Sequence, residues 1–302
     1  MDRNLIALLR VPYGNGGARP GADQGPDALL EAGLVRHLSQ LGLQTADEGA
    51  VLPPAAAAGS TQASGTKLKH LEEIAALNSE LADRVADIAS GGRFPLILGG
   101  DHSIAIGTIA GLTRHYRNLG VLWFDAHGDL NTEDTSPSGN IHGMSLAVNL
   151  GQGHPLLMQI RRQSSRIDPA KVVIIGARSL DEGERAYIRQ AGITCFTMHD
   201  IDRKGMPYVM EQALRILGDG TDGVHLSFDI DSLDPAEAPG TGTPIPGGVS
   251  YREAHLALEM MYESGLITSA EFVEVSPPLD SQKRTVRLAI GLIGSLLGER
   301  IL

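Results

Sequence analysis

The chain has 302 residues, of which 42% are hydrophobic and 20% charged, so it can form a sizeable core and is not disordered along its whole length. Its net charge of −11 argues against nucleic acid or an anionic membrane as the main partner. Cys195 is the only cysteine, which excludes an intramolecular disulfide, and no segment approaches the ~18–20 apolar residues that span a bilayer. We therefore expect a cytoplasmic protein.

Short apolar runs alternate with longer amphipathic segments along the chain. In chain order, we expect strands at 5–11, 44–48, 94–99, 119–125, 172–177, 193–197, 223–231 and 267–275, and helices at 27–41, 68–90, 104–116, 182–190, 206–217, 251–264 and 283–297. This alternation predicts crossover units and a parallel sheet within one three-layer α/β/α domain over residues 1–302. The low-complexity segment 52–67 is expected to be a surface loop.

Acidic residues and histidines follow several of the expected strands. In open parallel sheets, ligands bind beyond the carboxyl ends of the strands, so these side chains are expected to share one edge of the sheet. The strand-end residues are Asp101 and His102, Asp125, Asp229 and Asp231, and Glu274.

The sequence WFDAHGDLNT places Asp125, His127 and Asp129 at alternate positions. Alternate residues of an extended chain point to one side, so the three side chains are expected to converge, as are Asp229 and Asp231. Converging carboxylates repel one another unless a cation lies between them, and two divalent ions suit a set of four carboxylates and two imidazoles. Such mixed ligands favour Mn²⁺, with Fe²⁺, Co²⁺, Ni²⁺ or Zn²⁺ as alternatives, and disfavour Mg²⁺ and Ca²⁺.

Each motif taken alone also has a purely structural explanation. Asp101 and Ser103 could cap the helix that follows them, and the segment SFDIDSLDP could be a polar strand end before a turn at Asp234. Three such motifs at the ends of separate strands favour the metal site.

The motifs GGDHS, DAHGDLNT, SGNIHGM, SFDIDSLDP and GTGTPIPGG together resemble those of the ureohydrolase superfamily, and most closely those of bacterial arginases. The similarity covers nearly the whole chain. It implies a parallel sheet of about eight strands, a centre of two Mn²⁺ ions (with Co²⁺, Fe²⁺ or Ni²⁺ possible), and a small guanidino substrate, L-arginine, that is cleaved to L-ornithine and urea by a hydroxide bridging the metals. It also implies a homo-oligomer, either a trimer or a hexamer.

The resemblance assigns roles to individual residues. Asp129 would orient the hydroxide, His142 would transfer a proton, and Glu274 would hold the guanidinium. Asn131 and Ser138 match positions that contact the substrate α-carboxylate, and Asp181, with Glu184 nearby, matches the α-amino side. The metal ligands would be His102, Asp125, His127, Asp129, Asp229 and Asp231.

Other functions stay open at this point. Agmatinase, guanidinobutyrase and formimidoylglutamase activities would use the same chemistry on a different substrate. A metal-dependent deacylase could share a related sheet, but it would not need Glu274 or the SGNIHGM loop. A regulatory subunit with an inactive site would be expected to lack a ligand, whereas all six positions are filled.

Overall fold

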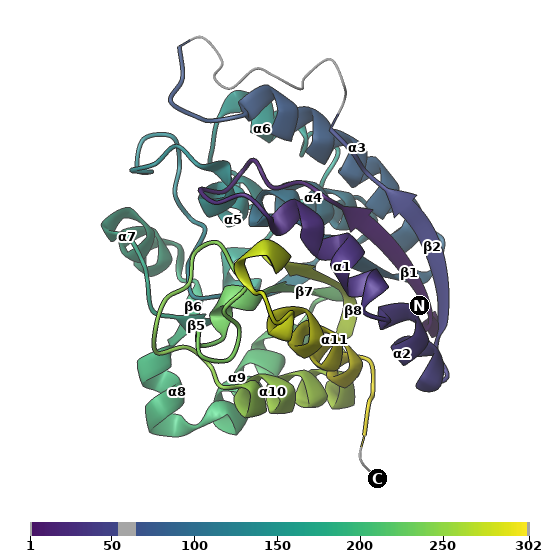
Figure 1. Cartoon of the computed structure of the whole chain (residues 1–302). Helices are drawn as coiled ribbons and strands as arrows, with labels where there is room; N and C mark the ends of the chain where they lie inside the picture. Colours follow the sequence, from purple (N-terminus) through teal and green to yellow (C-terminus); the bar gives the residue numbers. More distant parts are fainter. Residues whose placement is uncertain (1, 54–64, 301–302) are drawn as a thin grey trace.

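A parallel β-sheet forms the centre of the molecule (Figure 1). The computed structural model describes residues 2–53 and 65–300, so most of the expected loop at 52–67 lies outside the described residues. In that part of the chain, eight strands pair in the order β2-β1-β3-β8-β7-β4-β5-β6, and every pairing is parallel, as predicted. The strands are β1 (Asp2–Val11), β2 (Gln44–Ala50), β3 (Arg93–Gly99), β4 (Leu119–Phe124), β5 (Val172–Ala177), β6 (Thr194–Thr197), β7 (Gly223–Asp229) and β8 (Ile267–Val273).

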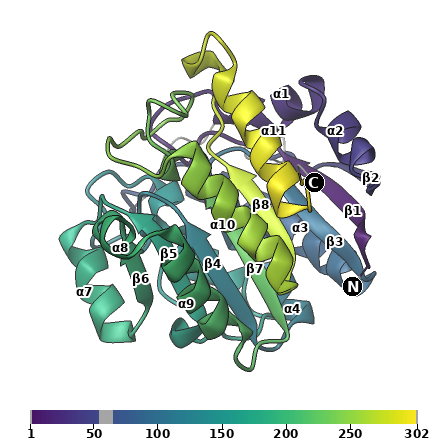
Figure 2. The ribbon, with the colours of Figure 1, turned by 90° about the horizontal axis from the view of Figure 1, so that it is seen from below.

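Helices cover both faces of the sheet and complete the three layers predicted from the sequence. One face packs against α3 (Leu71–Ser90), α4 (Ala105–His115), α5 (Ser145–Asn149), α6 (Pro155–Gln159) and α7 (Glu182–Ala191). The other packs against α1 (Gly25–Glu31), α2 (Leu34–Gln40), α8 (Met198–Lys204), α9 (Met206–Gly218), α10 (Tyr251–Ser264) and α11 (Arg284–Leu296). Figure 2 shows α9, α10 and α11 in front of the sheet, with α3 and α4 behind it. Among the described helices, none has the length and apolarity needed to cross a membrane.

Strand β4 shows why the strands read as unbroken apolar runs. Val121 and Trp123 belong to the core on one face of the sheet, and Leu122 and Phe124 belong to the core on the other. Successive side chains point to opposite faces of a sheet, and this strand, covered on both sides, is apolar at every position. Burial of both faces therefore explains the apolar sequence of β4, and the first polar residue after it, Asp125, marks where the chain leaves the core.

The strand order brings four of the expected site segments together. Strands β3, β8, β7 and β4 are neighbours at the middle of the sheet, although β4 is separated from β7 by about a hundred residues of chain. All four run in the same direction, so the segments that follow them emerge at one edge. His102, Asp125, Asp229 and Glu274 are on these segments.

The structure corrects several element boundaries. The helix expected at 27–41 is two helices, α1 and α2, because Gly33 adopts a left-handed conformation (φ 100°) at the N-cap of α2. The short helices α5, α6 and α8 were not predicted. Helix α8 has a signal that could have revealed it, since Thr197 and Asp200 form a capping box at its start. The strand expected at 223–231 ends at Asp229, and Ile230–Ser232 form a 3₁₀ turn.

Candidate metal centre and active site

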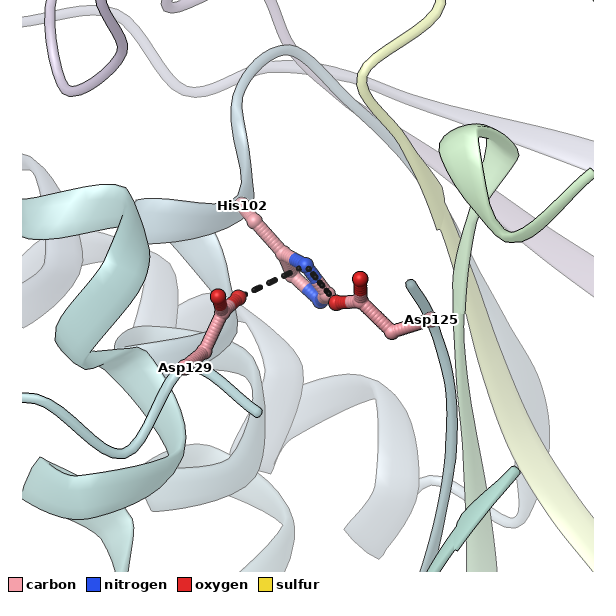
Figure 3. Close-up of side chains that lie close together, drawn as sticks. All are labelled: His102, Asp125 and Asp129. Atoms are coloured by element: carbon pink, nitrogen blue, oxygen red, sulfur yellow. Dashed lines mark ion pairs between the residues drawn. The ribbon is translucent and has the colours of Figure 1, made fainter. Parts of the chain in front are cut away.

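Six carboxylates and imidazoles converge beyond the ends of β3, β4 and β7. The first group surrounds His102 Nδ1, which lies 3.1 Å from Asp125 Oδ2, 3.0 Å from Asp129 Oδ2 and 3.1 Å from Asp229 Oδ2. Figure 3 shows the carboxylates of Asp125 and Asp129 reaching the His102 ring from two separate segments. The ligand atoms of His102, Asp125 and Asp129 are near enough to one another to bind one ion, and Asp229 contacts the same nitrogen.

A second group forms around His127. Its Nδ1 lies 3.2 Å from Asp231 Oδ2 and 3.4 Å from Asp125 Oδ1. Both groups have the spacing of metal ligands, and Asp125 belongs to both because it directs one oxygen to each. A shared carboxylate between two sets of donors is the arrangement expected of a centre for two metal ions.

The side chains of these motifs converge because the chain turns after each strand. The extended conformation expected from the alternate spacing was wrong. Strand β4 ends at Phe124, and Asp125 Oδ1 then accepts a hydrogen bond of 2.7 Å from the backbone N–H of His127. Asp229 Oδ1 accepts in the same way from Asp231 N, at 2.8 Å. Each aspartate therefore closes a turn two residues long. Convergence was predicted correctly, but its cause is a tight turn stabilised by the ligand itself.

Burial concentrates the charge of this cluster. Asp125, Asp129, Asp229 and Asp231 are all less than 7% exposed. Burial raises the pKa of Asp129, Asp229 and Asp231 above the usual range, and repulsion adds to it, from Asp125 at all three and from Asp231 at Asp229. Positive charge placed among these oxygens relieves that repulsion, so the electrostatics of the site favour bound cations.

The pKa values of the two imidazoles are also raised, but by attraction to the carboxylates and not by repulsion. Burial disfavours their charged forms, but the carboxylates around them outweigh it: Asp125, Asp129 and Asp229 raise the pKa of His102, and Asp231 and Asp125 raise that of His127 to about 12. These shifts measure how strongly the carboxylates attract a positive charge at the position of each Nδ1 atom.

Neighbouring side chains that were not predicted hold the ligands in place. The Trp123 ring stacks on His102, with centroids 4.2 Å apart, and its Nε1 donates to Asp125 Oδ2 at 3.0 Å. Thr243 Oγ1 donates to Asp231 Oδ2 at 2.8 Å. Thr243 lies within the GTGTPIPGG motif and Trp123 immediately precedes the Asp125 segment, so both had a sequence signal.

Two site residues have positive φ angles. Asp129 has φ 50°, and its carbonyl accepts from the N–H groups of Leu146 and Ala147, both at 3.1 Å. Glu274 has φ 63°, and its N–H donates to Gly100 O at 2.7 Å. Non-glycine residues in this region carry strain that surrounding contacts must offset, and such residues cluster at functional sites.

Glu274 is hydrogen-bonded to His142. Its Oε1 accepts from His142 Nδ1 at 3.0 Å and from the backbone N–H of His102, also at 3.0 Å. Burial disfavours a charged imidazole, but the hydrogen bond to Glu274 and the negative charge around it raise the pKa of His142 to about 9. His142 can therefore hold a proton at neutral pH.

A cavity of about 140 Å³ opens beside the cluster. Of the residues predicted for substrate and catalysis, six line it: Asn131, Ser138, Asp181, Glu184, His142 and Asp129. Glu274 is not among the lining residues but is hydrogen-bonded to His142, which is. Asn131 Nδ2 donates to Asp181 Oδ2 at 2.8 Å, which joins the two expected sides of the substrate head group. The part of the cavity lining formed by Asn131, Ser138 and Asp181 is thus polar and able to orient a zwitterion.

Glu184 contacts backbone from both of its oxygens. Oε1 accepts from Leu130 N at 3.0 Å and Oε2 accepts from Asp181 N at 2.8 Å. Burial raises its pKa to about 7 in spite of these hydrogen bonds. Glu184 therefore ties the start of α7 to the loop that follows Asp129.

The fold and the site define a class of protein: an α/β sheet protein with two candidate metal-binding groups of carboxylates and imidazoles at the carboxyl edge of its central strands. The family model described as "Arginase family" matches residues 4–298. The chain belongs to this family, whose enzymes are binuclear metal hydrolases, and it is an arginase-type hydrolase. Membership favours the ureohydrolase interpretation over the deacylase and the inactive subunit.

Relatives named as arginases match this chain over its full length. Arginase from Bacillus caldovelox is 52% identical over 98% of this chain and 99% of its own, and its crystal structure superposes with a TM-score of 0.94. Arginase from Bacillus subtilis (strain 168) is also 52% identical, over the whole of both chains. The structure of Entamoeba histolytica arginase in complex with L-ornithine is 34% identical, with a TM-score of 0.91 over 99% of this chain and all of the other.

Proposed function

We propose that this protein hydrolyses the guanidinium group of L-arginine to L-ornithine and urea at a centre of two Mn²⁺ ions. The observation that carries the proposal is the convergence of two donor groups on Asp125, next to a polar cavity. The arginases among its relatives, which match over the full chain, support the same reaction.

The donors fit manganese. The two groups supply imidazole nitrogens and carboxylate oxygens only, and Cys195 lies on β6, at the edge of the sheet. Mixed ligands of this kind suit Mn²⁺ better than the all-oxygen shells of Mg²⁺ or Ca²⁺. When bound, two such ions would supply a hydroxide nucleophile at neutral pH by lowering the pKa of a bound water. His102 and His127 would each hold one ion, with Asp125 shared.

The chain's own residues bind and orient the substrate. A planar guanidinium is suited to a carboxylate partner, and we assign that role to Glu274. Its Oε1 accepts from His142 and from the His102 backbone, and its Oε2 would accept from the substrate. His142 would give its proton to the departing amine, because a raised pKa keeps it charged while Glu274 fixes its ring.

Three polar residues that line the cavity, Asn131, Ser138 and Asp181, suit the head group of an amino acid. Ser138 Oγ accepts from Asn140 N, which leaves its O–H free to donate to a carboxylate. Asn131 uses one amide hydrogen on Asp181 and its oxygen on Thr135, so its second amide hydrogen is also free to donate. Asp181 adds an acceptor for an ammonium group, and Glu184 supports it.

A comparison of arginine with agmatine tests the proposal, because agmatine lacks the carboxylate. We expect urea release from arginine with a higher kcat/KM. Asn131→Ala removes a hydrogen bond to a charged group, which costs about 1.5–3 kcal/mol. We expect kcat/KM for arginine to fall about ten- to a hundredfold and kcat/KM for agmatine to stay unchanged. A preference for agmatine of more than tenfold, ~1.4 kcal/mol, would replace arginine as the substrate. Guanidinobutyrate and formimidoylglutamate complete the panel.

His142→Ala should lower kcat more than it raises KM. Loss of a positioned proton donor costs about 10²–10⁴-fold in rate, and added imidazole should restore part of it. Steady-state kinetics with and without imidazole provide the measurement. If the variant changed only KM, His142 would bind substrate and would not transfer the proton.

A further inference from the structure

We propose that Glu271 is a positioning residue for the metal centre: acting through Ser227, it keeps the ring proton of His102 on Nε2 and leaves Nδ1 free to bind a metal ion. The inference rests on the metal centre proposed above. It assigns a role to a buried carboxylate that neither the binding nor the proton-transfer steps use.

A chain of short contacts runs from the metal ligand into the sheet. His102 Nε2 lies 2.8 Å from Ser227 Oγ, and Ser227 Oγ donates to Glu271 Oε1 at 2.7 Å. Ser227 on β7 and Glu271 on β8 are paired across the two strands, so their side chains are held side by side. Ser227 and Glu271 are fully buried, and His102 is 1% exposed.

The direction of the hydrogen bonds follows from the number of protons. An ionised carboxylate only accepts, so the single hydroxyl proton of Ser227 points to Glu271. Ser227 Oγ can then only accept from His102, which requires the proton to be on Nε2. A neutral imidazole with Nε2 protonated presents a lone pair at Nδ1, the atom that faces Asp125, Asp129 and Asp229. Glu271 thus selects the tautomer that a metal ligand needs.

The same oxygen of Glu271 also lies near a histidine that the metal centre does not use. His225 Nε2 lies 3.4 Å from Glu271 Oε1, and its Nδ1 is 3.0 Å from Ser269 Oγ. Glu271 Oε2 has no hydrogen-bond partner among the described residues. A buried carboxylate with one unsatisfied oxygen is costly for the fold, so its presence behind a metal ligand is better explained by function than by stability.

Glu271→Gln tests the inference with almost no change in shape. The amide can donate to Ser227, which then can donate to His102 Nε2 and move the ring proton to Nδ1. We expect the affinity of the ion at His102 to fall about 10–100-fold, as for other partners of metal-ligating histidines. The affinity of the ion at His127 should change much less. Equilibrium dialysis of the protein against buffered Mn²⁺ resolves the two affinities.

Two serine variants provide a matched comparison. Ser227→Ala removes the middle of the chain and should weaken the same ion by a similar factor. Ser269→Ala is the same change at an equally buried position on β8, but its hydroxyl contacts His225 and not His102, so both affinities should stay as in the wild type. In the double variant of Ser227→Ala and Glu271→Gln, the losses should not add, because both act through one hydrogen bond.

The outcomes separate this inference from the proposed function. Thermal melts with chelator present show whether each variant folds. If Glu271→Gln does not fold, the metal affinities of Ser227→Ala test the inference. A wild-type protein that binds fewer than two Mn²⁺ ions would refute the metal centre itself. If the wild-type protein binds two ions and Glu271→Gln binds both with unchanged affinity, the role of Glu271 alone is overturned. If Glu271→Gln does not fold, unchanged affinities in Ser227→Ala have the same meaning.

Discussion

Asp129→Asn is expected to lower kcat for arginine by at least ~10³, the scale of losing a group that generates the nucleophile. Asp129 Oδ2 lies 3.0 Å from His102 Nδ1, and the residue adopts φ 50°. Asparagine tolerates this conformation as well as aspartate does, so the backbone should be retained while one negative ligand oxygen is lost. The measurements are urea release and the manganese content of the purified variant.

Asp134→Asn is the control for this substitution. Asp134 lies five residues further along the chain and is exposed, so the same chemical change there should leave kcat unaltered. Wild-type turnover in Asp129→Asn, with manganese still bound, would remove Asp129 from the mechanism. Equal losses in both variants would indicate a general effect of altered charge.

Removal of the metal should abolish activity altogether. The substrate carbon is resonance-stabilised and water at neutral pH is a poor nucleophile, so the reaction needs the hydroxide that bound metal ions would supply. Activity should return on addition of Mn²⁺, with Co²⁺, Fe²⁺ or Ni²⁺ as weaker substitutes. Full turnover in protein shown to contain no metal would refute the proposed chemistry.

Metal removal should also lower stability, which provides a readout independent of activity. An ion that binds only the folded protein stabilises it by about 2.7 kcal/mol per site when its free concentration is 100 times Kd. The cluster gives a physical reason to expect this, because burial and mutual repulsion raise the pKa of Asp129, Asp229 and Asp231. We expect a lower Tm in chelator than in Mn²⁺, and a control protein without the site should show no such difference.

The sequence was sufficient to predict the sheet and the convergence of these side chains for one physical reason. Strand β4 is buried on both faces and apolar at each position, so the first charged residue after it, Asp125 after Phe124, marks both the end of the strand and its emergence at the carboxyl edge of the sheet. Parallel pairing then places the ends of β3, β4 and β7 at the same edge, whatever their separation in the chain.

Features that depend on tertiary contacts could not be predicted in this way. The turns closed by Asp125 and Asp229 share the two-residue spacing of an extended chain, so spacing alone does not distinguish them. The φ angle of Glu274 depends on its hydrogen bond to Gly100, which is remote in sequence. Likewise, Glu271 reads as one polar residue in a strand until the pairing of β7 with β8 places it against Ser227.

Anomalous diffraction from crystals of the wild-type protein grown with Mn²⁺ tests the central claim most directly. We predict two manganese peaks about 3.5–4 Å apart, one at His102 with Asp129 and Asp229, the other at His127 with Asp231, and Asp125 between them. A single peak, or two ions bound elsewhere while these side chains keep their positions, would contradict the account.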